Sequence, residues 1–294
     1  MMLLGLMAVS CRHSDDDNEV YYGDTILAEC PTGQMLKYVV TNANTNTVEL
    51  YGFEHKEVYK GGALHIPYKV KHKGMEFRVM SIRKKAFKKC EKITSVYVED
   101  SVATIRKSAF KKCRGIEEVH LPALMDKIYP GTFSKCEKLR SVEIPEGVVV
   151  IGEGAFRKCK SMNRVKLPKN LKAVGYESFL GCKELTTLDL PNGVKEIGHR
   201  TFGNCTGLRE VNLPQSLTKI GDYAFANCES IGSVTIPNGV KSIGEGSFSG
   251  CAGLRSVRMP SELEHIGDWA FWGCNQLPTL AIPASVSDIG HHIQ

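Results

Sequence analysis

The sequence predicts a β-rich solenoid, in which stacked coils place a parallel sheet on one face and turns or short helical segments on the other. Nine cysteines recur every 23 residues from Cys90 to Cys274, and nine phenylalanines keep the same step from Phe87 to Phe271. Strict self-similarity at such a period indicates a solenoid or an array. The chain is 42% hydrophobic and 24% charged, which is typical of a globular protein and argues against disorder.

One repeating unit shows how each coil is built. From Leu139 to Cys159 it reads L-x-x-V-x-I-P-x-x-V-x-x-I-G-x-x-A-F-x-x-C. Polar and apolar residues alternate just before Pro145, which predicts a half-buried strand. Proline lacks the N–H that a ladder needs and ends the strand, and Gly152 marks a second turn. Since no unit can bury its apolar face alone, the uniform apolar columns predict a continuous stacked core.

Residues 20–65 lack the repeat, and we expect them to form an N-terminal β cap, because a solenoid must cover the exposed end of its core. Segments 36–40 and 47–51 read as two strands joined by a polar turn. The solenoid is predicted over residues 66–294, as about nine units plus an atypical first unit with a hairpin near 71–75. At its C-terminal end, either the last coil covers itself or a partner covers it.

The motif I/L-P-x-x-V-x-x-I-G-x-x-A-F-x-x-C-x-x-L-x-x-V resembles the BspA-type leucine-rich repeats of bacterial cell-surface proteins. The resemblance covers about residues 60–294. The motif differs from common leucine-rich repeats in one respect: proline occupies the turn after the strand, where those repeats carry Asn or Cys. It implies a right-handed leucine-rich-repeat coil. It also implies adhesion to host matrix proteins, mucosal surfaces or other bacteria.

Residues 1–11, MMLLGLMAVSC, resemble a bacterial lipoprotein signal that ends at a lipidated Cys11, although they carry no Lys or Arg. Residues 12–19 form an acidic tether, similar to the surface-export signal of Bacteroidetes lipoproteins. The resemblance implies an outer-membrane lipoprotein at the cell surface, held to the membrane through its lipid anchor only. The alternative is a disordered apolar N-terminus with an incidental cysteine.

The cysteine column predicts neither a metal site nor disulfides. Zinc needs four ligands around one point, whereas one cysteine per coil spreads the sulfurs along a line. Side chains on stacked coils point the same way, which disfavours disulfides, so we expect each cysteine to fill a tight corner of the core. The sequence shows no phosphate-binding loop, cofactor motif or nucleophile–base set. We therefore expect a non-enzymatic protein without metal or cofactor.

Three sets of residues are candidates for ligand binding. Residues 69–114 carry fifteen Lys or Arg against four acids, and stacking should align the cations between Phe and Cys. We name the resulting row the basic stripe: Lys88, Lys89, Lys111, Lys112, Lys135, Arg157 and Lys158. The varied outward positions of the predicted strands form the strand face: Tyr97, His120, Glu143, Lys166, Asp189 and Arg258. Trp272 is a candidate aromatic contact, although we favour the alternative that it covers the end of the core.

A polar lattice without reactive groups predicts an adhesin-like scaffold that recognises an extracellular protein or glycan through its repeat surface. One alternative is an accessory envelope lipoprotein that binds a polysaccharide or a protein complex. Another is a hydrolase with its site in residues 20–65. Nucleic acid is not expected as a partner, because aromatic residues do not interleave with the cations. The oligomeric state is left open.

Overall fold

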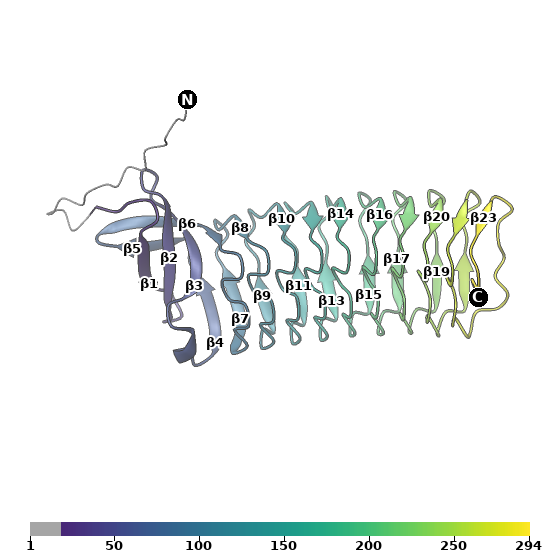
Figure 1. The fold of residues 1–294 in the computed structure, drawn as a ribbon, viewed down its shortest axis with the longest axis horizontal. Coiled ribbons are helices and arrows are strands. Elements are labelled where there is room, and N and C mark those ends of the chain that lie inside the picture. Colours follow the sequence, from purple (N-terminus) through teal and green to yellow (C-terminus); the bar gives the residue numbers. More distant parts are fainter. Residues whose placement is uncertain (1–18) are drawn as a thin grey trace, which may run out of the picture.

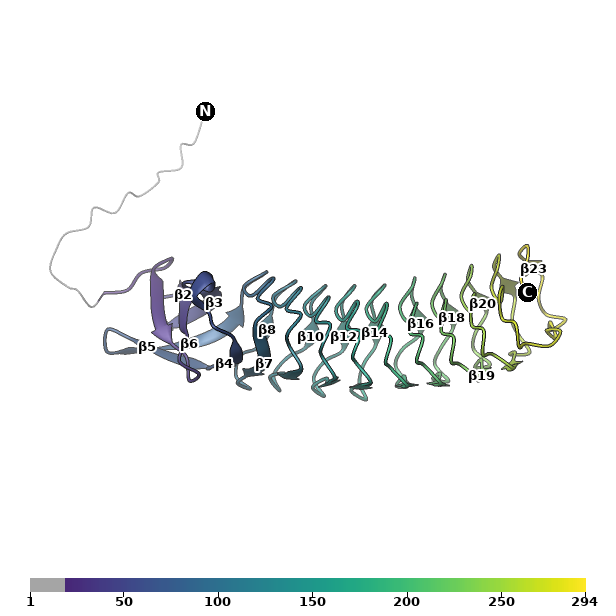
Figure 2. The same cartoon turned by 90° about the horizontal axis from the view of Figure 1, so that it is seen from below.

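The computed structural model describes residues 19–294 as a rod with a cap at its N-terminal end (Figure 1). Seen after a quarter turn, coil follows coil from the cap to the C-terminus (Figure 2). Within these residues the helical content is a single 3-10 turn, η1 (Lys56–Val58), and no helix is long and apolar enough to cross a membrane. The predicted signal segment, Cys11 and nearly all of the acidic tether lie outside the described residues.

The cap is a sheet that continues into the rod. Its antiparallel strands include the predicted pair near residues 36–51, and the hairpin expected near 71–75 is also present. Strand β3 pairs in parallel with β6, which also pairs in parallel with the solenoid strand β8 (Thr104–Ile105). The strands are β1 (Thr25–Glu29), β2 (Met35–Asn42), β3 (Thr47–Phe53), β5 (Lys69–His72) and β6 (Met75–Ile82).

The predicted strands before each proline form parallel pairs along one side of the rod. Register advances by one repeat, so that Ser141 lies opposite Arg164. The first of these strands, β4, comes from the segment that we assigned to the cap, and it pairs with β7. The strands are β4 (Gly62–Ile66), β7 (Ile93–Val98), β9 (Glu118–His120), β11 (Ser141–Glu143), β13 (Arg164–Lys166), β15 (Thr187–Asp189), β17 (Glu210–Asn212), β19 (Ser233–Thr235) and β21 (Ser256–Arg258).

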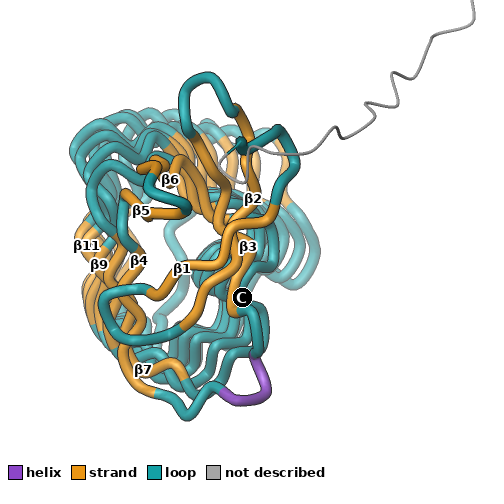
Figure 3. The backbone as a smooth tube through the Cα atoms, turned by 90° about the vertical axis from the view of Figure 1, so that its left-hand side faces the viewer, coloured by secondary structure: helices purple, strands orange, loops and turns teal. Residues whose placement is uncertain are grey.

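A second set of parallel strands, which the sequence did not predict, lies on another side of each coil (Figure 3). Each strand is two residues long, too short for polar–apolar alternation to reveal it. The strands are β8 (Thr104–Ile105), β10 (Lys127–Ile128), β12 (Val150–Ile151), β14 (Ala173–Val174), β16 (Glu196–Ile197), β18 (Lys219–Ile220), β20 (Ser242–Ile243), β22 (His265–Ile266) and β23 (Asp288–Ile289).

The segment between Phe and Cys forms tight turns on a third side, which we name the turn face. Backbone hydrogen bonds also join neighbouring coils here: the N–H of Phe133 donates to the carbonyl of Ala155 at 2.8 Å. The residue before each cysteine adopts a left-handed conformation, as at Lys89 (φ 64°) and Gly181 (φ 75°). Left-handed backbone reverses the chain sharply here, so that the cysteine that follows is buried in the core.

The core consists of stacked columns, as the repeat predicted. Phenylalanines from Phe87 to Phe271 are fully buried, and the ring centroids of neighbouring coils lie 5.3–5.7 Å apart. The cysteines beside them are buried and free, as expected. Each thiol from Cys113 to Cys274 also donates to a phenylalanine carbonyl of the preceding coil; Cys136 Sγ, for example, lies 3.3 Å from the oxygen of Phe110. Cysteine therefore fills the corner and satisfies a backbone oxygen at once.

Candidate functional site

The structure brings the basic stripe together on the turn face. Its members occupy corresponding positions in the first four regular coils, and their backbones are hydrogen-bonded from coil to coil. The N–H of Lys89 donates to the carbonyl of Lys111 at 2.9 Å, and that of Lys135 to Arg157 at 2.7 Å. Since the backbones are tied together, the cationic side chains form a continuous row along the rod.

The lysines of the stripe repel one another. Nearby Lys85, followed by partial desolvation and other lysines of the stripe, lowers the pKa of Lys88. Lys112 is the largest cause of the lowered pKa of Lys135. Within residues 19–294, Arg157 is the one stripe residue with an ion pair, through Nη1 to Glu177 Oε2 at 2.6 Å. An anionic ligand would relieve this repulsion, because the stripe lysines lack carboxylate partners in the described chain.

Several stripe lysines also stand where lysine is locally unfavourable. Lys89, Lys112, Lys135 and Lys158 have φ between 59° and 65°. For an L-residue other than glycine, this conformation costs about 1–2 kcal/mol. All five later coils carry Gly or Asn at the same position, the residues that tolerate it best: Gly181, Asn204, Asn227, Gly250 and Gly273. That substitution pattern was the sequence signal for a left-handed turn, which our sequence analysis missed.

Strand-face side chains, in contrast, pair with one another along the sheet. Lys166 forms an ion pair with Glu143, and its hydrogen bond is the largest cause of the lowered pKa of that carboxyl. Further along, the Asn212 amide donates to Asp189 at 2.6 Å. Much of the polar capacity of this face is therefore used within the protein.

The cap end of the strand face carries an aromatic pair. The rings of Tyr97 and His120 stack with centroids 4.5 Å apart, and His120 Nε2 lies 3.7 Å from Asp100 Oδ1. Arg258, at the other end, has no ion pair within residues 19–294. The strand face therefore offers a short aromatic platform and one uncommitted cation, whereas the basic stripe offers a run of cations.

Trp272 does not cover the end of the core, contrary to our expectation. It is 59% exposed and lies on the turn face, where its carbonyl accepts a hydrogen bond from Gly250 at 2.7 Å. The chain's last residues cover Phe271 instead: its N–H donates to Ile293 at 2.7 Å, and the Gln294 amide donates to Leu277 at 3.1 Å. The last coil thus covers itself, which leaves the indole available for contact.

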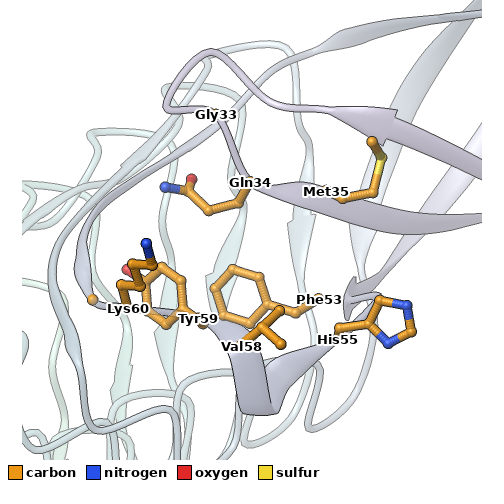
Figure 4. Close-up of a pocket in the computed structure, with 9 residues that line it drawn as sticks. Gly33, Gln34, Met35, Phe53, His55, Val58, Tyr59 and Lys60 are labelled. Carbon is orange, nitrogen blue, oxygen red and sulfur yellow. The ribbon is translucent and has the colours of Figure 1, made fainter.

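The cap contains a small, largely apolar pocket of about 290 Å³ (Figure 4). Phe53 and Tyr59 stack in its wall with centroids 4.4 Å apart, and Met35 and Val58 lie at its rim. Burial raises the pKa of Tyr59 to about 12, so its hydroxyl stays protonated and donates to the carbonyl of Gly62 at 2.8 Å. The pocket suits an apolar group better than acid–base chemistry. No group of three potential metal ligands exists within residues 19–294.

Comparisons with known proteins match the repeat. The family model described as BspA type Leucine rich repeat region (6 copies) matches residues 80–209 and 172–293. The leucine-rich repeat protein of T. pallidum (TpLRR) is similar at 27% identity and a TM-score of 0.60, over 67% of this chain and 87% of that one. A leucine-rich repeat protein from Bacteroides ovatus is 25% identical with a TM-score of 0.52, over 87% and 89% of the two chains. No curated protein matches.

Proposed function

Because the chain belongs to the BspA-type leucine-rich-repeat family, whose members are surface-associated repeat scaffolds, we propose that it is a non-enzymatic binding protein of the cell surface. In this proposal the basic stripe recognises an anionic protein or glycan outside the cell. The family and its solved relatives support a scaffold more than an enzyme.

One observation carries the proposal: lysines that have no ion pair within residues 19–294 stand at left-handed positions in successive coils. Lys89, Lys112 and Lys135 pay a local conformational cost and repel their neighbours. Neither effect benefits the fold, whereas both are expected where a row of positive charge serves an external ligand.

Binding would proceed through many weak contacts on a rigid support. The hydrogen bonds between coils hold the lysine backbones in place, so little chain entropy is lost when a ligand is bound. Attraction between exposed charges falls as salt screens them over a Debye length of about 8 Å at physiological ionic strength. Affinity for the ligand should therefore fall as the salt concentration rises.

The test is binding of the purified chain to a panel of matrix proteins, mucins and glycans at physiological salt. The stripe variant changes Lys88, Lys89, Lys111 and Lys112 to Glu. A matched control makes the same charge change on exposed lysines elsewhere: Lys169, Lys172, Lys195 and Lys219. We expect the stripe variant to lose binding and the control to retain it. Equal loss in both variants, or affinity that stays flat from low to physiological salt, contradicts the proposal.

Trp272 favours a second candidate function, an accessory envelope lipoprotein that binds a polysaccharide or a protein complex. An exposed indole on a rigid ridge is a good anchor for a ligand or partner. In that case Trp272→Ala should abolish binding while the four-lysine variant keeps it. The reverse result favours the stripe.

We also propose that the chain is anchored through a lipid on Cys11, which would hold it at the outer membrane. The cysteine follows the apolar segment MMLLGLMAVS, as in a lipoprotein signal. Labelling cells with a radioactive fatty acid should mark the protein, and Cys11→Ser should remove the label. Label that persists in the variant contradicts the anchor.

A further inference from the structure

The turn face is not uniform along the rod. The residue after each core phenylalanine is cationic in three of the first four coils, small in three successive later coils, and large again at Trp272: Lys88, Lys111, Ser134, Arg157, Leu180, Gly203, Ala226, Ser249 and Trp272. Where the side chains shrink, a groove of about 940 Å³ opens, and three residues of the basic stripe, Lys135, Arg157 and Lys158, line its cap-side part. Its volume lies in the range of ligand sites, and its long axis follows the coils.

The floor of the groove is formed by Gly203 and Ala226, which are buried. Their N–H groups donate within their own turns, to the carbonyls of Arg200 at 3.2 Å and Tyr223 at 3.1 Å. The N–H groups of Gly181 and Asn204 donate across to the carbonyls of Gly203 and Ala226 at 2.8 and 2.7 Å. The floor therefore presents no free strand edge for an extended peptide to pair with, which favours recognition through side chains.

Two asparagines provide matched hydrogen-bonding groups beside the floor. The Asn227 amide donates to Asn204 Oδ1 at 3.0 Å, which fixes both side chains. The Asn204 Nδ2 and the Asn227 Oδ1 have no hydrogen-bond partner within residues 19–294, and both asparagines are exposed and line the groove, so one donor group and one acceptor remain for a ligand. Sugar hydroxyls both donate and accept, so adjacent hydroxyls of a sugar ring complement this pair.

Cations outnumber carboxylates in the lining of the groove. Lys158 has no ion pair in the described chain. Arg200, whose guanidinium lies 5.3 Å from the centroid of the Tyr223 ring, likewise has none. Guanidinium groups bind carboxylate or sulfate oxygens through paired N–H donors. Two carboxylates also line the groove: Glu137 pairs with Lys160 at 2.8 Å, and Glu229 repels an anion near it.

We propose that this groove binds an acidic polysaccharide. Its carboxylate or sulfate groups lie against Lys158 and Arg200, and its ring hydroxyls bond to the Asn204–Asn227 pair. This inference rests on the proposed function and deepens it, because it names the ligand class and places the ligand beyond the lysines of the first coils. Lys135, Arg157 and Lys158 of the basic stripe line the groove, so an acidic chain longer than the groove would continue onto the remaining stripe lysines nearer the cap.

The test measures binding of the full chain to polygalacturonate, which carries carboxylates, to heparin, which carries sulfates, and to neutral dextran. The key variant is Asn204→Gly with Asn227→Gly, because glycine removes both amides while tolerating the left-handed backbone at these positions. Asn238→Gly, at an exposed loop position, is the matched control. Far-UV circular dichroism and the urea midpoint report whether each variant stays folded.

We expect polygalacturonate, heparin or both to bind, and the double glycine variant to bind about tenfold more weakly, as the loss of two hydrogen bonds predicts. Arg200→Ala should weaken the same ligand, whereas Asn238→Gly should not. The preferred probe identifies the acidic group. Unchanged affinity in the double variant together with loss in the four-lysine variant overturns the groove and leaves the proposed function standing. If a protein of the panel binds and no acidic glycan does, the groove proposal is also overturned while the proposed function stands. If dextran binds as well as the acidic glycans, charge plays no part in recognition.

Discussion

Replacing Lys112 by glycine should stabilise this protein, although it removes a side chain and adds backbone freedom. Lys112 has a φ of 65°, a conformation that costs a residue with a Cβ about 1–2 kcal/mol. Glycine avoids that cost, but its greater conformational freedom in the unfolded chain lowers the free energy of unfolding by about 0.5–1 kcal/mol. The free energy of unfolding should therefore rise by about 0.5–1 kcal/mol. Gly181 and Gly250 already occupy the same position in later coils.

The neighbouring residue supplies a matched control. Lys111→Gly removes the same charge from the same turn, but Lys111 is not left-handed, so glycine should there cost about 0.5–1 kcal/mol. Urea unfolding followed by circular dichroism gives both values. Both variants also remove a charge that neighbouring lysines repel. Near 1 M salt the Debye length is about 3 Å, so this repulsion is screened and the difference between the variants reports the backbone effect alone.

The comparison has a clear refuting result. The reasoning is supported if the urea midpoint rises for Lys112→Gly and falls for Lys111→Gly, while the slope of the unfolding free energy against urea concentration stays similar. If both variants are destabilised equally, the left-handed backbone does not cost the lysine what we infer. Lys112→Gly should also bind a polyanion more weakly, which would show that the lysine is kept for binding at the expense of stability.

Two further predictions concern the core. Phe179→Ala should cost about 3–5 kcal/mol of unfolding free energy, because the buried ring stacks on the rings of both neighbouring coils. Glu143→Ala removes an exposed ion pair and should change the stability little. Equal urea midpoints for the two variants would contradict the register of the coils. Raising the pH from 8 to 9.5 should lower the free energy of unfolding by about 1 kcal/mol for each thiol whose pKa burial raises, such as Cys182, and so lower the urea midpoint. Unfolded thiols release protons near pH 8.5, whereas these folded thiols keep them. Cys182→Ala should reduce this pH dependence, and a midpoint that stays constant or rises would contradict it.

The fold was largely predictable because every coil must bury the same face. Columns such as those of Phe156 and Cys159 predicted the stacked core, and proline marked the strand ends. The second ladder, including Val150–Ile151, was missed because two residues hold no periodicity. The thiol hydrogen bonds were also missed, since cysteine at a buried position reads simply as a small apolar residue.

The candidate site was predictable in part. A repeat of 23 residues places equal positions of neighbouring coils side by side, so the lysine row followed from counting. The left-handed backbone under Lys89 and the exposure of Trp272 did not follow, because they depend on how the turn reverses and on which residues cover the last phenylalanine.

The amino-acid sequence alone therefore establishes the repeat, the composition of the core and the alignment of like residues, because these depend on periodicity and burial. Ion pairing between coils is different: Glu143 finds Lys166, whereas Lys112 has no carboxylate partner in the described chain. The groove beside Gly203 likewise exists only when the neighbouring turns are in place. Both depend on the three-dimensional distances between side chains of different coils, which the order of residues along one chain does not contain.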